Sequence, residues 1–178
     1  MRTIACLTFL ALSLPAYADV VDRQPAGFAI SQSAHIAATP DKVYAALIQP
    51  AKWWNPAHTF SRNAAHLSLE AKAGGCFCES LAGGGSVQHG VVTYVAPGAA
   101  LRLRGPLGPL EAEGMEGVLT FTLKADGAGT RITVEDSVGG YAKSGLGQWP
   151  DLTDQVLAEQ VTRLQALLET GSPEPHKS

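Results

Sequence analysis

The sequence predicts an α+β domain in which one antiparallel sheet is covered by a long C-terminal helix. Between residues 66 and 141, short segments of alternating apolar and polar side chains are separated by Gly-rich or Pro-Gly turns, which is typical of an antiparallel meander. Residues 150–169 then carry apolar side chains at helical spacing, and Gly171 follows as a stop signal. A helix with one apolar stripe needs an apolar surface to cover, and one face of the sheet supplies it.

The elements before the meander are a strand and two short helices. Residues 28–38 alternate like a half-buried strand, which ends at Thr39-Pro40. Thr39 as the N-cap and Pro40 at the first helical position start a helix that Pro50 ends, and residues 51–54 form a second helical turn. The strands expected after these helices span residues 66–72, 75–81, 86–96, 99–105, 116–124 and 130–139.

The N-terminal residues have the pattern of a secretory signal peptide. Arg2 precedes an apolar stretch from Ile4 to Leu14, which is too short to span a bilayer, and the segment ends in an Ala-x-Ala site at Ala18. A buried core strand or helix is the alternative interpretation. We expect cleavage after Ala18, a periplasmic or secreted protein, and no membrane anchor in the mature chain. The predicted division of the chain is a signal peptide at 1–18, a lead segment at 19–27, the domain at 28–170 and a flexible tail at 171–178.

The charge of the chain argues against a nucleic-acid partner. Loss of residues 1–18 removes Arg2 and leaves 12 basic against 16 acidic side chains, a net charge of −4. The chain has no run of Lys or Arg that could release counterions from a phosphate backbone. The mature length suits one domain with a core that needs no metal or disulfide.

Several segments resemble a known family in sequence and in order. They are residues 38–47, Trp53-Trp54, Gly74-Gly75, residues 117–123 and residues 129–134. This set is similar to the START-like superfamily, also called SRPBCC or Bet v 1-like, and especially to its bacterial branch related to polyketide cyclases and chaperone-ATPase activators. The resemblance implies a helix-grip fold, in which a curved antiparallel sheet wraps around the C-terminal helix and leaves a cavity between them.

The hairpin formed by residues 75–81 and 86–91 predicts a polar pair on the cavity face. If both apolar sets share a face, the turn centres on Gly84, because a slip of one residue would reverse every side chain. Leu81 then faces Val87, Glu79 faces His89, and Phe77 faces Val91. Side chains opposite each other lie about 5 Å apart at Cβ, so Glu79 and His89 are expected to hydrogen-bond or ion-pair.

The hairpin around residues 126–129 places a second acid on the apolar side. Its register pairs Leu123 with Ile132, Phe121 with Val134, and Leu119 with Asp136. Because Asp136 is near the strand end, we expect it at the rim of the cavity.

The residues on the predicted cavity face allow structural and functional interpretations. Glu79 and His89 could be a closed pair that only fixes the sheet, a polar anchor for a hydrophobic ligand, or a general acid and base. Trp53 and Trp54 are expected to plug one end of the sheet as core residues, or else to gate a ligand. The candidate ligand-binding residues are Glu79, His89, Phe77, Val91, Phe121, Asp136, Trp53 and Trp54.

The cysteines give only a weak signal for a metal. Cys76 and Cys78 lie two apart on a strand, where Cα atoms are separated by about 7 Å, so an unbridged pair is favoured over a strained disulfide. A zinc ion needs about four converging ligands, and the register puts His89 on the other face. We assign no metal site, no cofactor and no catalytic residue.

The function that these features favour is an exported carrier or sensor of a small hydrophobic molecule. One alternative is an enzyme resembling polyketide cyclases or dehydratases, a lyase or isomerase using Glu79 and His89. The other is a protein-partner module resembling the chaperone-ATPase activators, which export disfavours because that partner is cytosolic.

Overall fold

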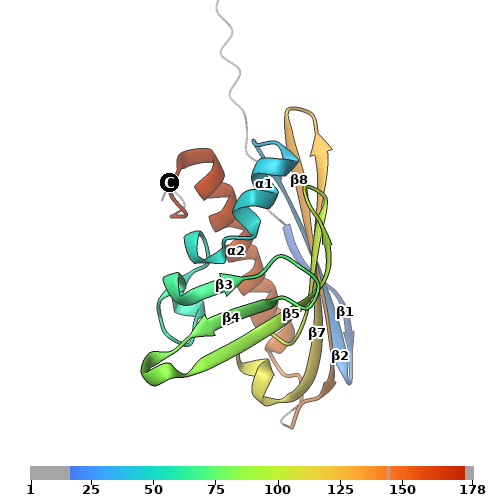
Figure 1. Ribbon diagram of the computed structural model, residues 1–178. Helices are drawn as coiled ribbons and strands as arrows, with labels where there is room; N and C mark the ends of the chain where they lie inside the picture. The colour runs from blue at the N-terminus through green and yellow to red at the C-terminus, as the bar shows by residue number, and fades with distance from the viewer. Residues whose placement is uncertain (1–16, 144, 175–178) are drawn as a thin grey trace, which may run out of the picture.

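Eight antiparallel strands form one curved sheet in the order β1-β2-β8-β7-β6-β5-β4-β3 (Figure 1). The computed structural model describes residues 17–143 and 145–174. The strands are β1 (Tyr17–Gln24), β2 (Gly27–Ile36), β3 (Leu67–Leu69), β4 (Cys76–Ser80), β5 (Ser86–Ala96), β6 (Ala100–Arg104), β7 (Gly114–Asp126) and β8 (Gly129–Tyr141).

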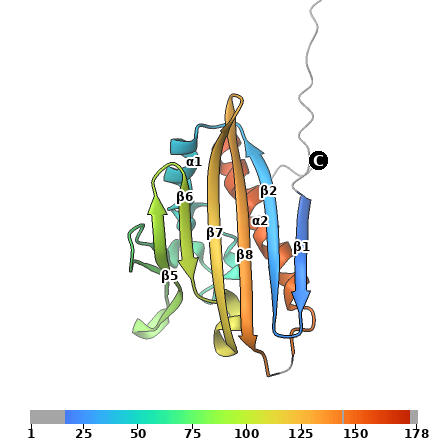
Figure 2. The ribbon, with the colours of Figure 1, turned by 90° about the vertical axis from the view of Figure 1, so that its right-hand side faces the viewer.

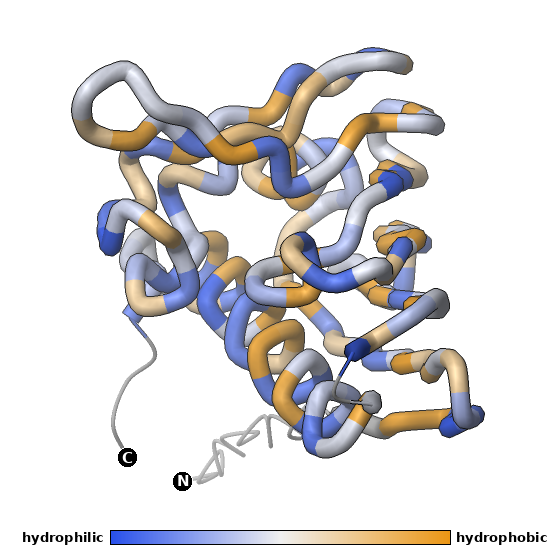
Figure 3. The backbone as a smooth tube through the Cα atoms, turned by 90° about the horizontal axis from the view of Figure 1, so that it is seen from below, coloured by the Kyte–Doolittle hydropathy of each residue, from blue (hydrophilic) through white to orange (hydrophobic). Residues whose placement is uncertain are grey.

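The long helix α2 (Trp149–Thr170) lies against one face of this sheet. Figure 2 faces the other surface, with α2 behind the strands, and Figure 3 shows the sheet bending around the helix. α2 ends at Gly171, whose left-handed φ of 82° suits a residue without a Cβ. The helix-grip fold predicted from the sequence is therefore confirmed.

Short helical segments connect the strands. They are α1 (Pro40–Leu47) and five 3-10 turns: η1 (Pro50–Lys52), η2 (Pro56–His58), η3 (Ala64–His66), η4 (Ala82–Gly84) and η5 (Gly108–Ala112). Within the described ranges, no helix combines the length and apolar character that a membrane span requires.

The core lies between α2 and the inner face of the sheet. One row of inward side chains runs across adjacent strands in the order Ile30, Asp136, Leu119, Leu103 and Val92. All five are buried, and α2 covers the inner face with buried apolar side chains such as Leu157, Val161 and Leu164. Every member of this row but one is apolar, which makes Asp136 the exception to explain.

The N-terminal edge of the sheet was not predicted as a strand. Residues 19–27 were expected to be a lead segment, but β1 pairs with β2 as far as Gln24, and Arg23 forms an ion pair with Asp151 of α2. The alternation in this stretch is masked by charged residues such as Asp22 and Arg23 on an exposed edge. The predicted signal peptide lies outside the described residues except for its last two positions.

Two further boundaries concern the strand predicted at 66–72 and the tail predicted at 171–178. The strand expected at 66–72 stops at Leu69, because the chain turns there and the Gly75 N–H bonds to the carbonyl of Lys72 at 2.8 Å. In the predicted tail, Glu174 accepts a hydrogen bond from Arg163 of α2 at 2.9 Å. Residues 175–178 lie outside the described part of the chain.

Candidate functional site

A pocket of about 400 Å³ opens between the N-terminal half of α2 and the β4–β5 part of the sheet. Most of the side chains around it are apolar. Two loops close its sides, residues 57–62 and residues 107–110. The lining residues are Trp54, Ala57, His58, Thr59, Phe60, Arg62, Leu67, Phe77, His89, Leu107, Gly108, Pro109, Leu110, Trp149, Leu152, Thr153, Val156 and Leu157.

Polar groups on α2 fasten the start of the first loop, and the residues just before it, to the helix. The side-chain oxygen of Gln160 accepts a hydrogen bond from the Asn55 N–H at 2.8 Å, and Glu159 pairs with His58 at 2.8 Å. The buried guanidinium of Arg163 donates to the carbonyl of Trp53 at 2.9 Å. The loop therefore forms a fixed wall of the pocket in this structure.

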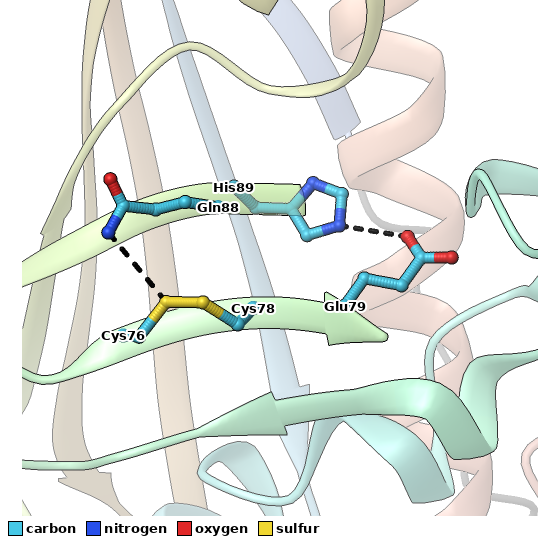
Figure 4. The surroundings of a disulfide bond; sticks show 5 residues. All are labelled: Cys76, Cys78, Glu79, Gln88 and His89. Atoms are coloured by element: carbon cyan, nitrogen blue, oxygen red, sulfur yellow. Dashed lines mark hydrogen bonds and ion pairs between the residues drawn. A yellow bond between two sulfur atoms is a disulfide. The ribbon is translucent and has the colours of Figure 1, made fainter. Parts of the chain in front are cut away.

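Glu79 and His89 form a buried pair at the sheet side of the pocket. His89 Nε2 lies 3.0 Å from Glu79 Oε2, and the Glu79 side chain is fully buried (Figure 4). The carboxylate also accepts hydrogen bonds from the backbone N–H groups of Phe60, at 3.1 Å, and Ser61. One carboxylate thus holds both the imidazole and the pocket loop.

The surroundings keep Glu79 ionised. Burial alone would raise the pKa of its carboxyl, but hydrogen bonds from Ser61, Phe60 and His89 outweigh burial and bring the pKa below its ordinary value. A carboxylate can only accept hydrogen bonds, so the Nε2 of His89 must carry the proton between them. The other ring nitrogen, Nδ1, is on the edge turned away from β4 in Figure 4.

Aromatic rings surround the imidazole. The Phe77 ring lies 5.1 Å from the His89 ring between centroids, and the Phe60 ring lies 5.9 Å from it. Trp54 packs edge-on against Phe77 at 5.6 Å. Among the described residues, His89 is the single polar side chain of the sheet that lines the pocket, and apolar surface frames it, including half-exposed Phe60.

The predicted register of the β4–β5 hairpin is wrong by two residues next to the turn and by one residue beyond the bulge. Glu79 pairs with Val87 rather than with His89, which centres the turn on Gly83, and the pairing shifts between Phe77 and Cys78. His89 is the extra residue of this bulge, so it turns inward beside Glu79 although it does not stand opposite it. The predicted contact is present, reached through a different register.

The bulge also moves Val91 away from the pocket. Val91 was expected to face Phe77 on the inner side, but it pairs with Cys76 and with Arg104, and Val92 takes the buried position. The physical reason is the extra residue, since one insertion reverses the parity of every residue after it.

The remaining candidates divide between core and pocket. Trp54 lines the large pocket, and Trp53 and Phe121 instead border a separate hollow of about 10 Å³ deeper in the core. The Trp53 indole N–H donates to the carbonyl of Ala46 at 3.0 Å, as a packed core residue would. The core interpretation of Trp53 therefore fits, whereas Trp54 has both roles.

Asp136 is not at the rim, as was expected. Its register opposite Leu119 is as predicted, but β8 continues to Tyr141 and pairs on both sides, which leaves Asp136 only 2% exposed. Burial raises the pKa of this carboxyl to about 7. Asp136 is not among the described residues that line either hollow.

Sequence reasoning missed the two loops that build most of the pocket. Neither segment has periodicity: Gly108 and Pro109 mark residues 107–110 as a loop, whereas residues 57–62 contain neither glycine nor proline. The contribution of α2 was visible in part, because Leu152, Val156 and Leu157 belong to its predicted apolar stripe.

Cys76 and Cys78 form a disulfide, contrary to the favoured unbridged pair. Their Cα atoms lie 5.4 Å apart, closer than the expected spacing of a regular strand, where the pairing with β5 is irregular. Both face the outer side of the sheet, as predicted from their parity. Among the described residues, no three His, Cys, Asp or Glu side chains converge as a metal site.

Comparison with known proteins gives a family and a fold. Residues 28–169 match the model of the family described as polyketide cyclase / dehydrase and lipid transport. No curated protein matches the chain.

Solved structures share the fold at low sequence identity. Protein CV1439 from Chromobacterium violaceum is 20% identical, with a TM-score of 0.56 over 79% of this chain and 96% of that one. CalU16 from Micromonospora echinospora is 17% identical, with a TM-score of 0.56 over 90% and 87%. The Aha1 dimer from Colwellia psychrerythraea is 18% identical, with a TM-score of 0.54 over 80% and 97%.

Proposed function

Because the chain belongs to the polyketide cyclase / dehydrase and lipid transport family, we propose that it binds a small hydrophobic molecule in the pocket between α2 and β4–β5. The observation that carries the proposal is the pocket of about 400 Å³, with mostly apolar walls and the imidazole of His89 in one of them. Pockets for small molecules typically combine this size with a few fixed polar groups.

His89 supplies the orientation of the ligand in this proposal. With Nε2–H held by Glu79, the Nδ1 lone pair accepts a hydrogen bond from a ligand hydroxyl. A protonated ring would instead donate to a carbonyl or carboxylate. The ligand class is therefore an apolar molecule with one oxygen function near one end.

Native mass spectrometry of protein purified from its own host tests whether such a molecule travels with it. Binding of the hydrophobic dye 1-anilinonaphthalene-8-sulfonate gives a second test. Val156→Trp fills the pocket and should abolish dye binding, whereas Val118→Trp, on the exposed outer face, should leave it unchanged. Equal dye binding by both variants, with no co-purified ligand, would contradict the proposal.

A second candidate function, a cyclase- or dehydratase-like enzyme, is supported by the position of the Glu79 carboxylate beside His89. An ionised carboxylate that fixes the tautomer of a histidine leaves the other nitrogen as a general base at the pocket wall. A β-hydroxy ketone probe, whose dehydration to an enone is followed by ultraviolet absorbance, tests this activity. His89→Gln should abolish turnover while dye binding persists. A wild-type protein without turnover would contradict the enzyme function and leave the carrier as the one proposed function.

We also propose that the protein is exported. The support is the basic start, the apolar stretch from Ile4 to Leu14 and the Ala-x-Ala site at Ala18. N-terminal sequencing of the protein from cell fractions tests it: a chain beginning at Asp19 outside the cytoplasm is expected, and an intact N-terminus in the cytoplasm would refute it.

A further inference from the structure

We propose that the Cys76–Cys78 disulfide is a thiol–disulfide exchange site that oxidises dithiols, with Cys78 as the sulfur that is attacked. The site is on the outer surface of the sheet, and it does not depend on what the pocket binds. The argument rests on the position of the disulfide, on its short ring and on one polar neighbour.

The two sulfurs are accessible from the outer surface. Cys76 and Cys78 are partly exposed, and the residue between them, Phe77, points inward and is buried. In Figure 4, Gln88 and His89 leave β5 on opposite sides, Gln88 toward Cys76 and His89 toward Glu79. A thiol from solvent or from a partner protein can therefore reach the disulfide without entering the pocket.

The disulfide contributes little to the stability of the fold. It joins residues only two apart, so it closes a very small loop and restricts the unfolded chain little. The backbone around it is already held on both sides, because Cys78 pairs with Ser68 of β3 and with Gln88 of β5. A bond that adds little to stability but is presented at the surface is better explained by its chemistry.

The two sulfurs are not equivalent. The amide nitrogen of Gln88 lies 3.8 Å from Cys76 Sγ and donates a hydrogen bond to it. When a thiolate attacks a disulfide, the leaving sulfur gains negative charge, and a donor beside it lowers the barrier. Gln88 can stabilise this charge on Cys76, which directs the attack to Cys78.

The reaction balances with a dithiol as the reductant. One thiolate of the dithiol attacks Cys78 Sγ, the bond between the two cysteines breaks, and Cys76 leaves as a thiolate. The second thiolate of the dithiol then attacks the first sulfur of the same dithiol, which is bonded to Cys78 in the mixed disulfide. This step releases Cys78 as a thiolate. The dithiol loses two electrons and becomes a disulfide, and the protein gains them as two thiols after protonation.

The position of attack can be measured directly. In the full chain carrying Cys6→Ser, Cys76 and Cys78 are the only cysteines. The oxidised protein is mixed briefly with the monothiol glutathione, quenched with acid, labelled with N-ethylmaleimide and mapped by tandem mass spectrometry. We expect glutathione on Cys78 and maleimide on Cys76, in excess over the reverse pattern by about fivefold, the effect of one hydrogen bond on the leaving group.

The role of Gln88 has its own test and a matched control. Reduction by dithiothreitol, followed by stopped flow, should be about fivefold slower in Gln88→Ala. Ser80→Ala, an exposed position on the same face of β4, should react at the wild-type rate. Free thiols in the isolated protein, equal adducts on the two cysteines, or an unchanged rate in Gln88→Ala would each overturn the proposal.

Discussion

Replacing Asp136 by asparagine should remove a strong pH dependence of stability. The carboxyl group is 2% exposed, and its strand neighbours Ile30 and Leu119 are apolar and buried. Burial raises the pKa of Asp136 to about 7 from an ordinary value of 3.8. Asparagine keeps nearly the same shape and cannot ionise, so the variant isolates the cost of the buried charge.

The size of the effect follows from the two pKa values. The unfolded chain ionises near pH 4 and the folded protein only near pH 7, so between these values unfolding releases a proton and wild-type stability falls as pH rises. Each pKa unit is worth about 1.4 kcal/mol. The stability gain of Asp136→Asn should therefore be near zero below about pH 4 and should level off at about 4 kcal/mol above about pH 7.

Urea unfolding followed by circular dichroism at several pH values measures this difference. Glu135→Gln is the matched control, because Glu135 is the exposed neighbour on the opposite face of the same strand. Its stability relative to the wild type should change little between pH 4 and pH 8. Parallel stability profiles for Asp136→Asn and the wild type would refute the reasoning, because they would mean that Asp136 ionises in the folded protein as easily as in the unfolded chain.

Three further outcomes are expected from other substitutions. Glu79→Gln should lower the free energy of unfolding by about 2 kcal/mol at pH 7. Because the pKa of Glu79 is lowered in the folded protein, the stability from its charge is present above the unfolded pKa and is lost as pH falls through the folded pKa. Urea titrations at acid pH should therefore show a smaller difference between the variant and the wild type. Arg163→Met should lower the free energy of unfolding by about 2 kcal/mol, measured by urea titration, because a buried backbone carbonyl loses its charged donor; an unchanged midpoint would contradict this. The double variant Cys76→Ser, Cys78→Ser should lose less than about 2 kcal/mol of unfolding free energy in the same assay, because the disulfide closes a small loop. A larger loss would mean that the disulfide stabilises the fold.

The two long hairpins show why one register was predictable and the other was not. The β7–β8 register is as predicted, because Asp126 and Gly129 close a turn of only two residues and apolar side chains alternate without interruption on both strands. The β4–β5 turn is longer and contains Gly83 and Gly84, both at positive φ, so several turn centres satisfy the same sequence.

The bulge at His89 left no mark in the sequence pattern. Gly90 follows it and has no side chain whose polarity would show which face it takes. The inward position of His89 was still predicted, because it followed from the parity that His89 shares with Val87, and the pairing changes parity only after His89. The position of the 57–62 loop could not be predicted, because α2 holds it through a side chain far away in sequence, Glu159, which pairs with His58.

The strand order has a consequence for how the chain acquires its structure. β2 pairs with β8, so the sheet joins segments about a hundred residues apart, and α2 is the last described element to be synthesised. Such distant pairings slow folding, and until the final helix arrives the apolar row from Ile30 to Val92 has nothing to cover it. A ribosome-bound chain truncated before Trp149 should therefore recruit chaperones and aggregate on release.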